Sequence, residues 1–163
     1  YKNLINQLEY GGKLIFIRHA YAPGNGDPAG FNLNDCSTQR NLNDDGRKQA
    51  QRIGEFFNRN KIEIDKVLSS EWCRCKETAK IAFKNYSTNS FLNSFYSSKF
   101  SKNKDKQVKA FNYYIKNLES NKNLIFVTHY VFISEVLNYG PSSGEIVVSD
   151  KNLNIIGSIE IDF

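Results

Sequence analysis

Two short runs of nearly the same sequence stand far apart in this chain. Residues 14–19 read Leu-Ile-Phe-Ile-Arg-His, and residues 124–129 read Leu-Ile-Phe-Val-Thr-His. Each is an apolar, β-branched and aromatic run too short for a helix, which is typical of a buried strand. Each ends in one of the chain's two histidines, His19 and His129. Because ligands bind beyond the carboxyl ends of strands in open α/β sheets, we expect the two strand ends to meet at one site.

The pattern around these runs alternates strands and helices. Strands are expected near 13–18, 62–68 and 123–128, with a short one near Phe91-Leu92 and a closing hairpin of 145–148 and 155–161. Helices are expected at 1–10, 44–58 (with Asp44 as its N-cap), 72–83, 106–118 and 131–137. This alternation predicts a three-layer α/β/α fold with a mostly parallel central sheet and a C-terminal antiparallel hairpin. With 163 residues, one domain over 1–163 is the simplest arrangement.

Composition excludes some classes of function. The chain carries 22 basic and 17 acidic residues, a net charge of +5, but no basic stripe interleaved with aromatics, so no nucleic-acid partner is expected. No apolar run reaches the length of a membrane span. The sequence contains no methionine, which a removed signal peptide or a trimmed chain would explain, so an exported or periplasmic location and a cytoplasmic one both stay open. The oligomeric state is also open.

Three cysteines leave an odd one. If the protein is exported, Cys36 could pair with Cys73 or with Cys75. The spacing of these cysteines lacks the ligand pairs of a zinc site, and no metal or other cofactor is expected.

Phosphoryl transfer to a side chain needs a nucleophile and cations. A neutral imidazole is a competent nucleophile near pH 7, and arginine offers a rigid fork of donors to phosphoryl oxygens. Arg18 precedes His19. Arg74 follows the second strand in the first turn of a helix, whose N-terminus itself favours an anion, and His129 ends a third strand.

At this point the sequence resembles the histidine phosphatase superfamily, the phosphoglycerate mutase-like proteins. Four segments, in the family's order, carry the resemblance. They are Arg18-His19-Ala20 (Arg-His-Gly in the family), Arg40 to Ala50 (a Leu-Thr-x-x-Gly-x-x-Gln-Ala helix start), Ser69-Ser70 through Arg74 to Thr78-Ala79 (Ser-Ser-x-x-x-Arg-x-x-x-Thr-Ala), and Val127-Thr128-His129 (Val-Ser-His).

The resemblance implies a role for each matched residue. His19 would be the nucleophile that becomes phosphohistidine. Arg18 and Arg74 would clamp the phosphoryl group, and His129 would donate to it. Asn25 falls where many members carry a phosphate-contacting asparagine, and Arg40 would add a cation.

The sequence departs from the family at the position of the general acid. The stretch where larger members carry a glutamate acid, residues 91–99, has no carboxylate, and Tyr130 stands where another branch carries aspartate. Glu71 is the tentative acid, with Asp27 and Asp35 as alternatives by proximity to the motifs. A phosphatase acting on phosphohistidine would need no strong acid, because the leaving group is an imidazole.

These observations predict a metal-independent phosphoric monoester hydrolase that works through a phosphohistidine on His19. Its substrate would be a phosphorylated small molecule or a phosphoprotein. Two alternatives stay open, namely a non-catalytic phosphate-binding module of the same fold and a phosphoglycerate-type mutase. The missing acid and the short chain argue against the mutase.

Overall fold

The computed structural model describes residues 1–163 and is built on one six-stranded sheet with the order β3-β2-β4-β1-β5-β6. The strands are β1 (Leu14–Arg18), β2 (Ile64–Ser69), β3 (Ser87–Thr88), β4 (Asn123–Thr128), β5 (Ile146–Ser149) and β6 (Ile155–Ile159). Strands β1 to β4 are parallel to one another, whereas β5 runs antiparallel to both β1 and β6. The predicted mixed sheet with a C-terminal antiparallel pair is confirmed.

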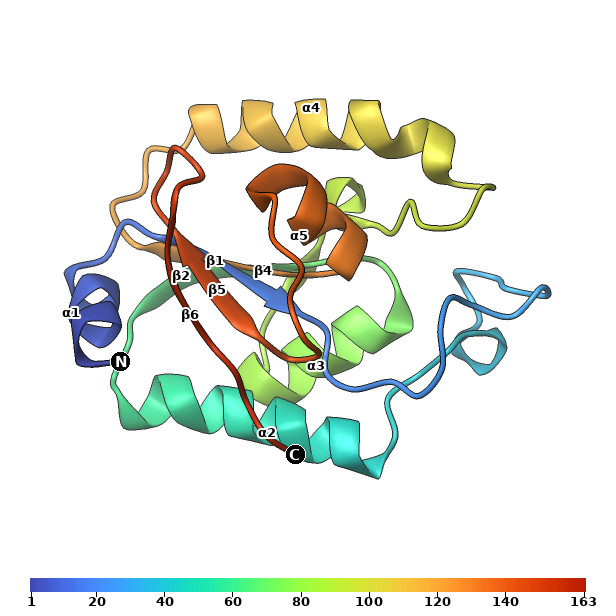
Figure 1. Ribbon diagram of the computed structural model, residues 1–163, viewed down its shortest axis with the longest axis horizontal. Helices are drawn as coiled ribbons and strands as arrows, with labels where there is room; N and C mark the ends of the chain where they lie inside the picture. The colour runs from blue at the N-terminus through green and yellow to red at the C-terminus, as the bar shows by residue number, and fades with distance from the viewer.

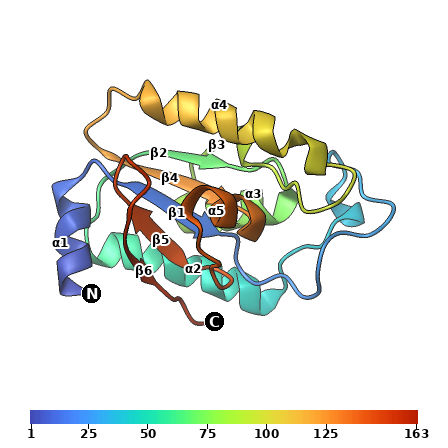
Figure 2. The ribbon, with the colours of Figure 1, turned by 45° about the horizontal axis from the view of Figure 1, so that its top comes forward.

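Helices cover both faces of this sheet (Figure 1). They are α1 (Lys2–Tyr10), α2 (Asp44–Arg59), α3 (Cys73–Phe83), α4 (Lys104–Lys116) and α5 (Tyr130–Leu137). The ribbon places α4 and α5 on one side and α2 and α3 on the other, with α1 at the end of the sheet opposite the long loops (Figures 1 and 2). No helix has the length and apolar character needed to cross a membrane.

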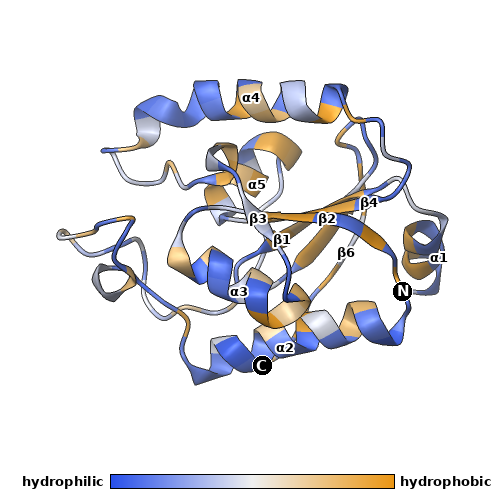
Figure 3. Ribbon diagram, turned by 180° about the vertical axis from the view of Figure 1, so that it is seen from behind, coloured by the Kyte–Doolittle hydropathy of each residue, from blue (hydrophilic) through white to orange (hydrophobic).

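Strands β1 and β4 each contain a continuous apolar run because both faces of the sheet are covered there. Ile15 and Ile17 of β1 pack in the cluster beneath α2 and α3, whereas Leu14 and Phe16 pack against α4 and α5. All four side chains are fully buried. Figure 3 shows the same division, with hydrophobic strands between helices whose outer faces are hydrophilic. Burial of each such side chain contributes about 1.5–3 kcal/mol, which makes β1 and β4 a firm base for the residues that follow them.

Local capping explains where the elements differ from the prediction. The N-cap of α2 is Asn43 rather than Asp44, because the Asn43 side chain accepts a hydrogen bond from Gly46 N. The short strand expected near Phe91-Leu92 is wrong. Asn89 accepts from Phe91 N there and starts a 3-10 turn, Ser90–Leu92, while the strand that joins the sheet, β3, lies just before it.

A disulfide joins the long loop 21–43 to α3. It pairs Cys36 with Cys73, one of the two partners left open by the sequence. Cys75 is a free, fully buried thiol. The loop is thus tied to the helix turn that carries Arg74.

Candidate active site

Three strand ends lie next to one another, as the two histidine-ending runs predict. In the sheet register Arg18 of β1 is opposite Thr128 of β4, and Ser69 of β2 is opposite Val127. The residues directly after β1 and β4 are His19 and His129, whose ring centroids are 5.8 Å apart. In Figure 1 this edge of the sheet faces the end of the molecule where the long loops lie.

His19 is held in one orientation. Its Nδ1 donates to the carbonyl of Ala20 at 2.8 Å, so the proton lies on Nδ1 and Nε2 keeps its lone pair. Arg74 Nε lies 3.2 Å from that Nε2. Burial, reinforced by the charge of Arg74, lowers the pKa of His19 well below its ordinary value. The side chain is therefore a neutral base with its unprotonated nitrogen beside a guanidinium.

Arg74 is itself fixed by a carboxylate. Its Nη1 donates to Asp27 Oδ1 at 2.8 Å and to the carbonyl of Arg40 at 3.3 Å. Asp27 also accepts from Trp72 Nε1 at 3.0 Å and from the backbone N–H of Arg40 at 3.1 Å. Burial alone would raise the pKa of Asp27, but the hydrogen bond and charge of Arg74 outweigh it and hold that pKa below its usual range. Asp27 is therefore an ionised anchor for Arg74.

His129 contacts two donors through one nitrogen. Its Nε2 lies 2.8 Å from Ser70 Oγ and 3.6 Å from Cys75 Sγ. Ser70 Oγ already accepts from the N–H of Trp72, and burial raises the pKa of the Cys75 thiol to about 12. The hydroxyl and the protonated thiol are thus both available to donate to Nε2. A hydrogen bond donated by either group to Nε2 requires the imidazole proton of neutral His129 to lie on Nδ1.

Two further arginines surround the histidines. Arg18 Nη1 donates to the carbonyl of Pro141 at 3.0 Å, and its guanidinium lies over the Tyr130 ring, 5.3 Å from the centroid. Arg18 Nε is buried without a hydrogen-bond partner, which is costly unless a ligand supplies an acceptor. Arg40 donates to the carbonyls of Gly26 and Ala22, and burial, followed by the charge of Arg74, lowers its pKa to about 10.

These groups line one cavity of about 530 Å³. Seven of the nine residues that the sequence singled out lie on its wall: Arg18, His19, Asn25, Asp27, Arg40, Arg74 and His129. Three guanidinium groups at a buried pair of neutral imidazoles form a strongly cationic pocket, which suits a doubly charged phosphoryl group.

Comparisons with known proteins agree with this geometry. A family model described as histidine phosphatase superfamily (branch 1) matches residues 14–91, the segment that holds His19 and Arg74. The matched residues contain three of the four segments that resemble this superfamily in the sequence. No curated protein matches the chain.

Solved structures share the histidine phosphatase fold over most of the chain. The protein histidine phosphatase SixA, complexed with tungstate, aligns with a TM-score of 0.64 and 15% identity, covering 92% of this chain and 96% of that one. A phosphoglycerate mutase from Thermus thermophilus gives 0.62 and 15% over 92% and 99%. A candidate alpha-ribazole-5'-P phosphatase from Escherichia coli gives 0.64 and 14% over 94% and 97%. At these identities the likeness is one of fold.

Glu71, the acid expected from the sequence, is not on the cavity wall. Its carboxylate accepts from Asn93 Nδ2 at 2.8 Å, and its backbone N–H donates to Asn93 Oδ1. Asp35 is exposed and accepts from Ser37 within its own turn. The carboxylate on the wall is Asp27, ionised and paired with Arg74. Asp27, the carboxylate on the cavity wall, is therefore not a proton donor.

Sequence reasoning missed three contacts that shape this site. Ser70 touches His129, Tyr130 stacks under Arg18, and Asp27 orients Arg74. The Ser-Ser motif in the sequence could have pointed to Ser70. The other two depend on how the loops fold back, for which the sequence carries no periodic signal.

Proposed function

We propose that this protein is a phosphatase that hydrolyses a phosphomonoester or a phosphohistidine through a phosphohistidine formed on His19. The observation that carries the proposal is the orientation of His19. Its Nδ1 is engaged by the Ala20 carbonyl, and its unprotonated Nε2 lies in a cavity beside Arg74. The SixA fold match, a protein histidine phosphatase, supports the same class of reaction.

In the first step His19 Nε2 forms a bond to phosphorus while the bond to the leaving group breaks, and the leaving group takes the electron pair. Arg18 and Arg74 neutralise the phosphoryl oxygens, with a phosphoryl oxygen accepting from the otherwise unpaired Arg18 Nε. His129 donates a hydrogen bond from Nδ1 to the phosphoryl group. Water then attacks phosphorus, the bond between phosphorus and His19 Nε2 breaks with its electron pair returning to Nε2, and inorganic phosphate leaves with neutral His19 restored. No metal takes part in the proposed steps, because guanidinium groups supply the positive charge.

The test is hydrolysis of para-nitrophenyl phosphate by the wild-type protein and by His19→Asn. Wild type should turn over with and without EDTA, and His19→Asn should lose at least about a thousand-fold of kcat, as nucleophile removal does in comparable enzymes. Arg74→Gln should lose activity as well, whereas Arg52→Gln, an exposed arginine on α2, should not. Equal, EDTA-insensitive rates in wild type and His19→Asn would refute the mechanism.

Trapping the intermediate separates this proposal from its two alternatives. Wild type quenched during turnover should carry an acid-labile, base-stable phosphoryl group that His19→Asn lacks, and it should release inorganic phosphate. A phosphate-binding module would bind phosphate without turnover of any phosphoester or phosphohistidine. A mutase would require a bisphosphate primer and would pass the phosphoryl group to another hydroxyl rather than to water.

A further inference from the structure

We propose that the phosphate ester bound in the cavity is a small aryl phosphate whose ring carries a second negative charge. This inference rests on the proposed function, because it takes the phosphoryl end to lie at His19. It concerns the remainder of the cavity, which a phosphoryl group alone does not fill: about 530 Å³ lies in the range of pockets that hold whole organic ligands, about 300–1,000 Å³.

An aromatic wall begins directly beside the histidines. The Trp72 ring centroid lies 5.4 Å from that of His129. Phe31 stacks on Trp72 at 5.1 Å, and Phe100 meets both rings edge-on at 5.4 and 5.8 Å. All three line the cavity. Phe31 and Phe100 are only partly buried and can offer a ligand ring the same favourable contacts, whereas Trp72 is 2% exposed.

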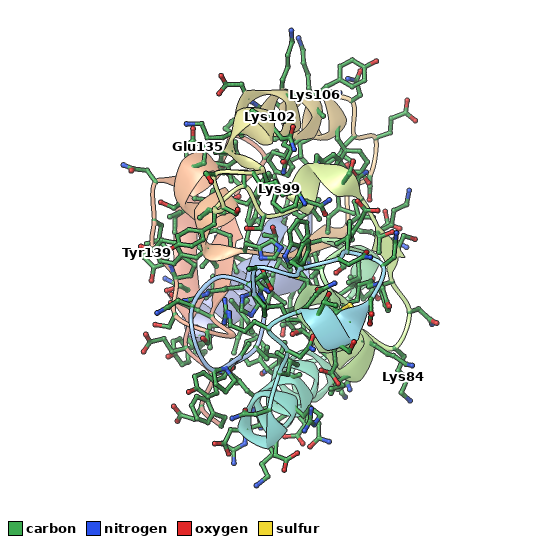
Figure 4. All side chains as sticks on the ribbon, turned by 90° about the vertical axis from the view of Figure 1, so that its right-hand side faces the viewer. Lys84, Lys99, Lys102, Lys106, Glu135 and Tyr139 are labelled. Atoms are coloured by element: carbon green, nitrogen blue, oxygen red, sulfur yellow. A yellow bond between two sulfur atoms is a disulfide. The ribbon has the colours of Figure 1, made fainter.

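Lys99 supplies the charge at the outer part of this wall. Its Nζ lies 5.5 Å from the centroid of the Phe100 ring, and the side chain lines the cavity. It forms no salt bridge. Because the cavity's own carboxylate, Asp27, is taken by Arg74, a negative group on the ligand is the counter-charge available to Lys99. Figure 4 shows Lys99 toward the middle of this face, whereas Lys102 and Lys106 lie farther out, near α4.

The chemistry of the site favours the same class of leaving group. No protonated carboxyl lies on the cavity wall, so an alkoxide would have to leave without a proton. A phenolic oxygen has a pKa of about 10 and departs as an anion far more readily. An aryl ester therefore fits both the aromatic wall and the missing acid.

The size of the cavity, about 530 Å³, suits a small molecule. Tyr96 reaches across from the segment after β3 and packs against Gly26, where an added Cβ would lie 3.6 Å from Tyr96 Cε2. Gly26 has a φ of +64°, a conformation that glycine adopts without strain. The two loops thus approach each other at the cavity wall.

The experiment measures binding rather than turnover. Trp72 is the chain's single tryptophan, so its fluorescence reports ligand binding in the cavity. Three phosphonates, which His19 cannot hydrolyse, form the series: methylphosphonate, benzylphosphonate and 4-carboxybenzylphosphonate. The ring should tighten binding about ten-fold over methylphosphonate, and the carboxylate should add about three-fold at low salt.

Two variants test which residue provides each gain in affinity. Phe100→Leu should reduce the gain from the ring at least three-fold, and Lys99→Gln should abolish the gain from the carboxylate while keeping the gain from the ring. Lys102→Gln, an exposed lysine outside the cavity, is the matched control and should behave as wild type. Lys99 is exposed, so its variant tests the charge even if Phe100→Leu folds poorly.

Equal dissociation constants for all three phosphonates would overturn the inference, as would a gain from the carboxylate that survives in Lys99→Gln. Selective binding without any phosphatase activity would instead contradict the proposed function and leave the ligand class standing. Turnover of para-nitrophenyl phosphate together with equal binding of the three phosphonates would support the proposed function and contradict the ligand class. The two failures are therefore distinguishable.

Discussion

Ser70 Oγ lies 2.8 Å from His129 Nε2, with both side chains buried. The same hydroxyl accepts from Trp72 N at 3.1 Å and lies 3.3 Å from Asn93 Oδ1. Asn93 Oδ1 already accepts from Glu71 N at the shorter distance of 2.8 Å. Ser70 Oγ thus has two acceptors within reach, and donation to the nearer one, His129 Nε2, would hold the imidazole proton of His129 on Nδ1.

We expect Ser70→Ala to lower kcat about ten-fold, the cost of one lost buried hydrogen bond, with a smaller change in KM. Long-range ¹H–¹⁵N NMR of the two imidazoles should show a loss of the Nδ1-protonated form of His129. Ser69→Ala is the matched control, because Ser69 is equally buried but its hydroxyl bonds to the Ser70 carbonyl. An unchanged His129 tautomer in Ser70→Ala would contradict this role.

Asp27→Asn should weaken the fold and strengthen anion binding. The Arg74 guanidinium would lose its buried counter-charge, a change that typically costs about 3–5 kcal/mol. The urea midpoint should fall, while added inorganic phosphate should restore more stability than it adds to wild type, because the anion now balances Arg74. Asp44→Asn removes an exposed ion pair with Arg47 and should leave the midpoint unchanged. If both variants unfold at the same urea concentration, Asp27 does not anchor Arg74.

Stability should fall as the pH drops below about 6.5. Both histidines are neutral in the folded protein because burial, with Arg74, lowers their pKa well below the ordinary value. Above that ordinary value neither state binds the protons. Below it the unfolded chain takes them up first, so the free energy of unfolding declines by up to about 2.7 kcal/mol per pH unit for two groups. Urea unfolding between pH 7.5 and 5 measures the slope, and His129→Gln should halve it. A slope that is the same in both proteins would show that His129 titrates normally.

Opening the disulfide should loosen the site as well as the fold. Closing a loop between cysteines 37 residues apart contributes about 3–4 kcal/mol in the chain-entropy description. Cys36→Ser should lose a comparable amount, and KM should rise because Cys73 directly precedes Arg74. Dithiothreitol should destabilise wild type to the same extent and have no effect on Cys36→Ser. A dithiothreitol effect on that variant would point to another cause.

Sequence patterns predict the parts of this molecule that repeat or alternate. The buried runs of β1 and β4 placed His19 and His129 at one edge, and the motif after β2 placed Arg74 beside them. Patterns fail where a hydrogen bond from one side chain decides the position of another group. Glu71 has the right position in the chain for an acid, but the amide of Asn93 holds it off the cavity wall. Asn89 likewise turns an apolar pair that reads as a strand into a 3-10 turn.

The pairing of β1 with β4 has a consequence for how the protein acquires activity. Leu14 pairs with Leu124, so the two imidazoles become neighbours only after a contact between segments more than a hundred residues apart has formed. Such non-local contacts are slow to form. During refolding from urea, regain of phosphate-ester hydrolysis should therefore coincide with the slowest structural phase. Neither an N-terminal nor a C-terminal fragment can supply both histidines. A chain in which β1 and β4 are not yet paired should therefore have no activity.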